Sequence, residues 1–140
     1  MRTVSDDDGD RYVLLKESED SSLVRDPETG ERRHLDTDTL STVDGESPLA
    51  TTARAVPEAV RTLLTAVHDD RALGLLVHLD ADGPISVRAL LSSTDLCESD
   101  LHGLLVEFRA AGLIKETTVA GERGYAPTEK TAEALSELLG

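Results

Sequence analysis

The residues best suited to catalysis or metal binding are four histidines and one cysteine. The histidines (His34, His68, His78 and His102) are scattered, with no pair four residues apart and no acidic residues at metal-ligand spacing. A protein metal site needs several such ligands brought together, so we predict no metal site. The chain also lacks a nucleophile elbow, a phosphate-cradling glycine loop and paired catalytic carboxylates. We therefore expect no enzyme activity and no cofactor.

The single cysteine, Cys97, excludes an internal disulfide and any cysteine-based metal cluster. It stands where an N-cap serine or threonine usually begins a helix, a position that stabilises a thiolate. One hypothesis is redox sensing, in which oxidation or a disulfide between subunits alters function. The other is that Cys97 is a small buried residue in the place of serine.

The composition is strongly acidic. The chain has 14 Lys and Arg against 28 Asp and Glu, a formal net charge of -14, and 2% aromatic residues. Abundant Asp and Thr with scarce Lys are typical of proteins from extreme halophiles. At about 1 M salt the Debye length is about 3 Å, so such charge is screened and says little about partners. No apolar run is long enough to span a membrane and no signal peptide is evident, so we expect a cytoplasmic protein.

The N-terminal part predicts little regular structure beyond a small sheet. Residues 1–10 are polar and acidic, and we expect a disordered arm. Residues 11–36 contain β-prone runs around the turn sequence Asp-Pro-Glu-Thr-Gly, which predicts a β-hairpin or a three-stranded meander. Residues 37–56 are rich in Asp, Thr, Ser and Gly and indicate a linker.

Helical periodicity begins near Pro57 and continues to the end of the chain. Apolar residues at helical spacing predict helices over 57–68, about 70–82, 87–92, 98–111 and from 129 onward, of which the first two are either distinct or one helix bent at 68–70. The expected N-caps are Asp69 or Asp70 for the second helix, Ser86 for the third and Thr128 for the last. Gly112 ends the fourth of these helices, and residues 113–119 and 125–127 follow as two strands joined by a glycine-bearing turn. A short helix, a tight turn, a longer helix and a β-hairpin are the layout of a winged helix-turn-helix. We therefore predict a mainly α fold with a small β-wing, in which residues 57–140 form the winged helix-turn-helix domain behind the N-terminal hairpin or meander.

Two motifs in this part resemble known prokaryotic regulators. The sequence Phe-Arg-Ala-Ala-Gly-Leu-Ile at 108–114 resembles the junction between recognition helix and wing in the MarR, ArsR and PadR groups. The sequence Tyr-Ala-Pro-Thr-Glu-Lys-Thr-Ala at 125–132 is similar to their wing exit and final helix. Pro127 stands in place of the usual Leu, and Thr131 in place of the usual Gly. The whole resembles a winged-helix protein of a halophilic archaeon that carries an added N-terminal β-hairpin.

The resemblance implies a DNA-binding transcriptional regulator and a set of contact residues. Its recognition helix would expose Ser99, His102 and Arg109 to the groove, together with the carboxylates Glu98 and Asp100. Those carboxylates suit a helix N-terminus but repel phosphate. The supporting basic residues would be Arg88 on the first helix of the motif and Lys115 and Arg123 on the wing. Gly121 and Gly124 would allow the wing to approach DNA closely.

Other surfaces suggest further partners. Arg25, Arg32 and Arg33 could form a second basic strip on the hairpin, facing phosphate or an acidic patch of another subunit. By resemblance, helices at 57–68 and 129–139 would pair in a homodimer. The alternative function is a protein-interaction module of the same fold, whose acidic second helix meets a basic partner.

Overall fold

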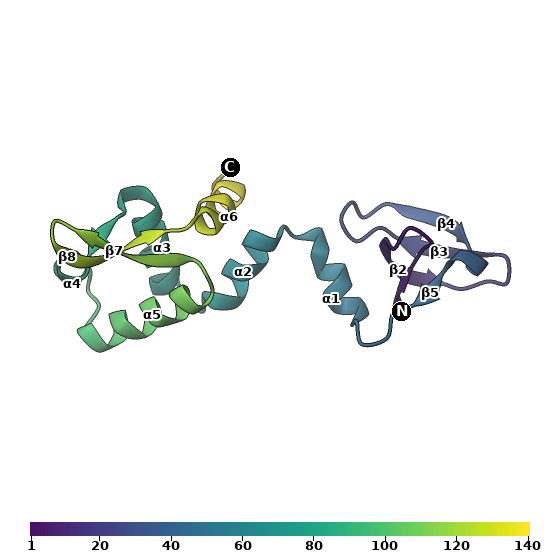
Figure 1. Cartoon of the computed structure of the whole chain (residues 1–140), viewed down its shortest axis with the longest axis horizontal. Helices are drawn as coiled ribbons and strands as arrows, with labels where there is room; N and C mark the ends of the chain where they lie inside the picture. Colours follow the sequence, from purple (N-terminus) through teal and green to yellow (C-terminus); the bar gives the residue numbers. More distant parts are fainter. The chain divides into compact units, whose positions relative to one another are not determined.

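The computed structural model describes all 140 residues, which form two compact units, Met1–Pro57 and Glu58–Gly140 (Figure 1). Unit 1 contains β1 (Arg2–Ser5), β2 (Arg11–Lys16), β3 (Ser21–Arg25), β4 (Arg32–Asp36), η1 (Thr37–Thr39), β5 (Ser41–Thr42), α1 (Pro48–Thr52) and η2 (Ala53–Ala55). Unit 2 contains α2 (Glu58–Ala66), α3 (Asp70–Asp82), β6 (Ile85–Ser86), α4 (Val87–Ser93), α5 (Glu98–Ala110), β7 (Ile114–Val119), β8 (Glu122–Pro127) and α6 (Glu129–Leu139).

The prediction of a mainly α fold is wrong. Helices take 46% of the residues and strands 26%, with a five-stranded antiparallel sheet in unit 1 and a three-stranded sheet in unit 2. The meander predicted at residues 11–36 is present as β2, β3 and β4, but these are only three of the five strands. The strands that were missed are two to four residues long, too short to show a periodicity in the sequence.

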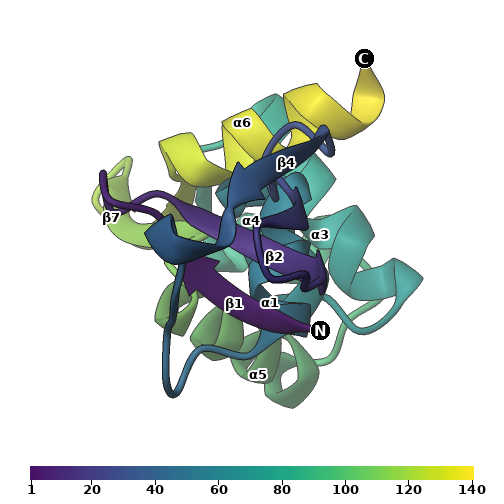
Figure 2. The ribbon, with the colours of Figure 1, turned by 90° about the vertical axis from the view of Figure 1, so that its right-hand side faces the viewer.

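The sheet of unit 1 has the strand order β4-β3-β2-β1-β5, and β1 and β2 run antiparallel side by side (Figure 2). Successive side chains of a strand point to opposite faces. One face carries a small apolar core of Val4, Tyr12, Leu14 and Val24, against which Leu35 and Leu40 pack. On the other face α1 packs against β1 and β2, and Thr51 Oγ1 lies 2.7 Å from Thr3 Oγ1. The unit therefore has its own core and does not rely on unit 2 for one.

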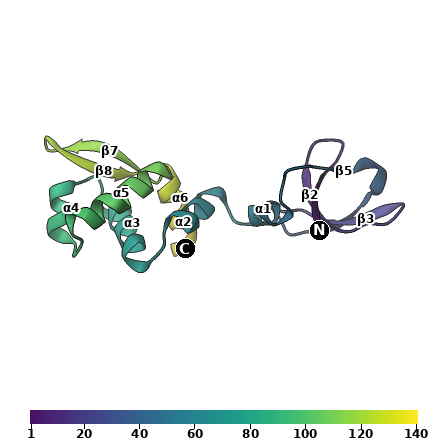
Figure 3. The same cartoon turned by 90° about the horizontal axis from the view of Figure 1, so that it is seen from below.

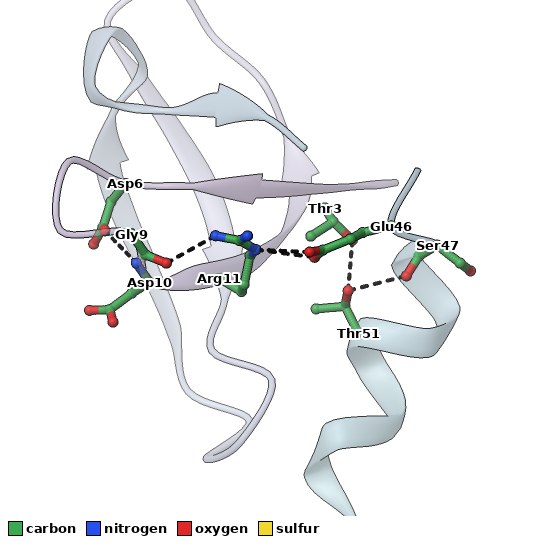
Figure 4. A network of polar contacts seen from close by, with 8 residues as sticks. All are labelled: Thr3, Asp6, Gly9, Asp10, Arg11, Glu46, Ser47 and Thr51. Atoms are coloured by element: carbon green, nitrogen blue, oxygen red, sulfur yellow. Dashed lines mark hydrogen bonds and ion pairs between the residues drawn. The ribbon is translucent and has the colours of Figure 1, made fainter. Parts of the chain in front are cut away.

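The disordered arm predicted at 1–10 and the linker predicted at 37–56 are both corrected by the structure. The arm is a strand, β1, and a turn in which Asp6 Oδ1 accepts hydrogen bonds from the backbone N–H groups of Asp8 and Asp10, at 3.0 and 2.9 Å. The linker contains β5 and α1. Shortly before α1, Glu46 accepts hydrogen bonds from Arg11 Nε at both carboxylate oxygens, at 3.3 and 3.1 Å (Figure 4). Polar composition misled the prediction because few residues order these segments: Val4 and Leu40 join the apolar core, and the hydrogen bonds above hold the rest.

Tyr12 gives unit 1 a testable dependence on alkaline pH. Burial of the phenol raises its pKa above the ordinary value of 10.0, although Arg33, whose guanidinium donates to the Tyr12 hydroxyl at 3.3 Å, lowers it in part. The unfolded chain therefore loses this proton at lower pH than the folded chain, and unit 1 should lose stability as the pH rises through the folded pKa. Urea unfolding at a series of alkaline pH values measures this loss, and Tyr12→Phe should flatten it. An equal loss in the wild type and the variant would refute the assignment.

The helices of unit 2 lie where the apolar periodicity predicted them, and three of their caps are those expected. Asp69 Oδ1 accepts from Ala72 N–H at 2.8 Å, Ser86 Oγ from Ala89 N–H at 3.1 Å, and Cys97 Sγ from Asp100 N–H at 3.4 Å. Gly112 ends α5 with φ 77°, a left-handed conformation that favours glycine. The largest fully buried side chains of the unit are Leu76, Leu79, Leu90, Leu101, Phe108, Leu113, Thr131 and Leu135. None of the helices combines the length and the apolar content needed to cross a membrane.

The start of α6 departs from the prediction. Thr128 does not cap the helix through its side chain; its hydroxyl instead donates to the Gly112 carbonyl at 2.6 Å. Thr131, at the position where the resembling families have glycine, donates its buried hydroxyl to the Leu113 carbonyl at 2.6 Å. Both hydroxyls thus fasten α6 to the chain that leaves α5.

Candidate nucleic-acid interface

The predicted contact residues lie on three elements that Figure 3 shows together: α4, α5 and the β7–β8 hairpin. The hairpin turns at Ala120 and Gly121, with φ 51° and 80°, the pair of positive values typical of a type I′ turn. This two-residue turn is shorter than the one predicted, so β8 begins at Glu122 instead of Tyr125. Alanine at the first turn position is not a typical type I′ residue, which explains why the sequence pattern did not reveal it.

A groove of about 470 Å³ runs between α5 and the hairpin. Its walls are Val87, Glu98, Ser99, Leu101, His102, Leu105 and Arg123. It brings together three of the predicted contact residues, Ser99, His102 and Arg123, from elements about twenty positions apart. Hydroxyl, imidazole and guanidinium groups are all able to hydrogen-bond base edges or phosphate oxygens. The acidic residue Glu98 lines the same groove.

Arg123 is held in place by Tyr125. Its Nη2 donates to the Tyr125 hydroxyl at 2.8 Å, and its guanidinium carbon lies 5.7 Å from the ring centroid. This hydrogen bond raises the pKa of Arg123, so the guanidinium stays charged. Tyr125 is itself buried in the β6-β8-β7 sheet. A buried side chain therefore fixes the position of the Arg123 guanidinium at the edge of the groove, and the charge of the guanidinium is exposed.

Each predicted arginine is paired with a glutamate. Arg109 Nη1 lies 2.9 Å from one carboxylate oxygen of Glu116, and Arg123 Nε lies 3.4 Å from the other. Arg88 Nη2 lies 3.1 Å from Glu122. All these side chains are well exposed, so each pair contributes little to stability and exchanges readily with other anions. Sequence reasoning missed Glu116 and Glu122, although a correct hairpin register would have placed Glu116 diagonally across from Arg123.

Of the predicted wing residues, Lys115 points away from the groove and Gly124 packs against β6, whereas Gly121 lies in the turn at the tip of the hairpin. Glu116 and Tyr125 are directly opposite in the hairpin, so Lys115 points to the face opposite Tyr125, away from the groove residue Arg123. Gly124 serves contacts inside the protein: a Cβ there would come within 2.6 Å of the Ile85 carbonyl oxygen. The absence of a side chain at Gly124 is thus required by the approach of β6.

The proposed basic strip on unit 1 is divided by strand alternation. Arg25 and Arg32 are directly opposite in β3 and β4 and share one face. Arg33 lies on the other face, where it makes an ion pair of 3.3 Å with Asp26 and its guanidinium carbon lies 5.3 Å from the Tyr12 ring centroid. The three arginines therefore do not form one surface.

The remaining candidate groups are exposed. Cys97, which could have been a small buried residue, has an exposed thiol that accepts the Asp100 N–H. The carboxylates of Asp6, Asp8 and Asp10 come within 4.8 Å of one another, although the sequence pattern predicted no acidic residues at metal-ligand spacing. The hydrogen bonds that Asp6 accepts show that this group serves the β1–β2 turn.

Comparison with known proteins identifies the family of the chain. A family model described as a family of unknown function, DUF7346, matches residues 1–139. The chain belongs to this family. No curated protein and no solved structure matches it. Because the DUF7346 match runs through both units, the N-terminal sheet is part of the family's pattern and not an addition to a separate domain.

Proposed function

We propose that this DUF7346 protein is a cytoplasmic DNA-binding transcriptional regulator that uses α4 and α5 as a helix-turn-helix and the β7–β8 hairpin as a wing. The observation that carries the proposal is the groove between α5 and the hairpin, where Ser99, His102 and Arg123 converge. In this geometry α5 enters the major groove, Ser99 and His102 meet base edges, and Arg123 meets a phosphate or the minor groove beside it.

The ion pairs of this surface determine how DNA would bind. Arg88, Arg109 and Arg123 must exchange a glutamate for a phosphate, because the structure pairs each of them with a carboxylate. Each exchange leaves a glutamate carboxylate near DNA, so the gain in binding free energy per phosphate contact is smaller than for an arginine without an ion pair. Binding should therefore be weak in dilute buffer, where the net charge of -14 repels DNA over a long range. At about 1 M salt the repulsion is screened within about 3 Å, and close contacts of hydrogen-bonding groups dominate.

Dimerisation is part of the proposal. Within the chain α2 and α6 pack against each other, as Figures 1 and 3 show, and Lys130 Nζ lies 3.8 Å from Glu58. Three leucines of these helices are left exposed: Leu64 by 61%, Leu138 by 51% and Leu139 by 73%. A second copy covering them would remove this apolar surface from water. A two-fold dimer of this kind reads two half-sites of a palindromic operator.

The direct test is an electrophoretic shift with genomic fragments in high-potassium buffer. The wild type should shift a subset of fragments, and Arg123→Ala and His102→Ala should each weaken that shift several-fold. Arg123→Ala should in addition reduce the slope of log affinity against log salt by about 1, as expected for a lost phosphate contact. Lys115→Ala is the matched control, since Lys115 lies on the opposite face of the hairpin. An absence of any shift by the wild type, or an equal effect of all three variants, would contradict the proposal.

A second candidate function is favoured by the opposite flank of α5. A hollow there is lined by three acidic residues, Asp69, Asp100 and Glu107, and one basic residue, Arg71, together with Leu96, Ser99, Gly103 and Leu104. Val106 on the same helix is 52% exposed. Carboxylates around a small apolar area suit a basic protein partner. A pull-down that yields one stoichiometric protein, lost in Asp100→Asn and retained in Arg123→Ala, would favour this function over DNA binding.

A further inference from the structure

The outer edge of β4 is open to another strand. In the order β4-β3-β2-β1-β5, β4 is the first strand and pairs only with β3, and four of its five residues are exposed. The hydrogen bonds at the two ends of this pairing show which residues of β4 are bonded to β3. Asp26 N–H donates to Glu31 O at 2.8 Å, and Thr37 N–H donates to Asp20 O at 3.1 Å. In an antiparallel ladder, bonded and non-bonded pairs alternate. The backbone groups of Arg33 and Leu35 therefore point to β3, and those of Arg32, His34 and Asp36 point outward.

The charges on this edge are unbalanced within one chain. Arg32 lies directly opposite Arg25, a like-charge cross-strand pair, which is destabilising. Neither of these arginines makes an ion pair in the chain, although the net charge is -14. Asp36 lies at the other end of β4, on the same face as Arg32, and opposite Ser21. One end of the open edge is therefore positive and the other negative.

We propose that β4 pairs antiparallel with β4 of a second copy, in the register that places His34 opposite His34 and Arg32 opposite Asp36 of the copy. Hydrogen bonds form between the two strands only in registers that place outward-pointing residues opposite one another. The proposed register uses all three outward-pointing residues of each strand. It also places both arginine–aspartate pairs in contact, one on each side of the two-fold axis. Each Arg32 would then have a carboxylate on one side to offset Arg25 on the other.

A second copy fits this edge because the strand is complementary to itself. In two antiparallel copies of the sequence Arg-Arg-His-Leu-Asp, the positive end of each strand lies opposite the negative end of the other. On the other face of the sheet, Leu35 of one copy lies opposite Arg33 of the second. The carbonyl of Asp36 already accepts the Thr39 hydroxyl at 2.7 Å, but a carbonyl oxygen has a second lone pair. Five residues per strand bury little surface, so we expect a weak, concentration-dependent association. It involves no residue of the proposed DNA groove and does not depend on DNA binding.

His34→Pro tests the backbone pairing. Proline removes an N–H that points away from β3, and edge strands tolerate proline at such positions, so unit 1 should remain folded. Sedimentation velocity over a range of concentrations should give the wild type twice the limiting mass of His34→Pro. Both proteins also carry Leu139→Glu, which places a charge on the exposed leucine surface of α6, so that a separate α2–α6 contact does not contribute to the mass. Leu35→Pro is the matched control: it removes an N–H that points to β3, and circular dichroism should show a loss of thermal stability that His34→Pro lacks.

A charge exchange tests the register. Arg32→Asp and Asp36→Arg should each lower the association constant about tenfold, because like charges then face each other twice. The double variant should restore it, and Arg123→Ala should leave it unchanged. The proposal is overturned if the wild type has the mass of His34→Pro at every concentration, or if the double variant associates no better than the single ones. If the wild type is monomeric, the occupant of the β4 edge would be a strand of a different protein.

Discussion

Replacing Phe108 with alanine should lower the free energy of unfolding of unit 2 by about 3–5 kcal/mol, the largest effect expected of any substitution discussed for this protein. Phe108 is the only phenylalanine, and it is fully buried on α5. Its backbone carbonyl also accepts the Leu113 N–H at 2.9 Å, at the turn where α5 gives way to β7. A cavity at this site would loosen the joint between the helix and the hairpin that flank the groove.

The two tyrosines allow the units to be followed separately in this experiment. The chain has no tryptophan, and Tyr12 lies in unit 1 whereas Tyr125 lies in unit 2. In a Tyr12→Phe background, tyrosine fluorescence during urea unfolding reports unit 2 alone. Val106→Ala is the matched control on the same helix, since its side chain is 52% exposed and its loss should cost about 0.5 kcal/mol or less. Equal destabilisation by the two substitutions would show that Phe108 does not anchor the unit.

Elements that depend on interactions between residues close in sequence were predicted, and elements that depend on distant residues were not. The helices of unit 2 were predictable because their signals are local: apolar residues at helical spacing, and the caps Asp69, Ser86 and Cys97. The short strands β1, β5 and β6 were not, because each is specified by its partner strand more than by its own residues. Tertiary pairing thus overturned the mainly α prediction.

Half of the candidate contact residues come together in one groove, but their ion pairs could not be predicted from the sequence. Ser99, His102 and Arg123 converge as the helix and hairpin positions implied. That Arg109 and Arg123 share one glutamate depends on the cross-strand register of β7 and β8, which a single sequence does not fix. The same limitation applied to Lys115, whose side of the hairpin follows from strand alternation once that register is known. Where a charge lies relative to its neighbours was therefore the principal information added by the structure.

Glu116→Gln should make the protein bind DNA about tenfold more tightly, which is the sharpest expected consequence of that shared glutamate. One Glu116 carboxylate occupies both Arg109, at 2.9 Å, and Arg123, at 3.4 Å. Glutamine keeps the size of the side chain but removes the charge, so both guanidinium groups become available to phosphates. The slope of log affinity against log salt should steepen by about 1–2, since each phosphate contact releases about one counterion. Stability should change little, because both ion pairs are exposed to solvent.

The control for this substitution is Glu137→Gln, which makes the same change in net charge at an exposed position on α6. Fluorescence anisotropy with a fragment that the wild type shifts, titrated at several potassium concentrations, gives both affinity and slope. The gain from Glu116→Gln should shrink when Arg123→Ala is combined with it, because one of the two released guanidinium groups is then missing. Should Glu116→Gln and Glu137→Gln raise the affinity equally, the effect would come from net charge alone, and Arg109 and Arg123 could not be the groups that meet the phosphates.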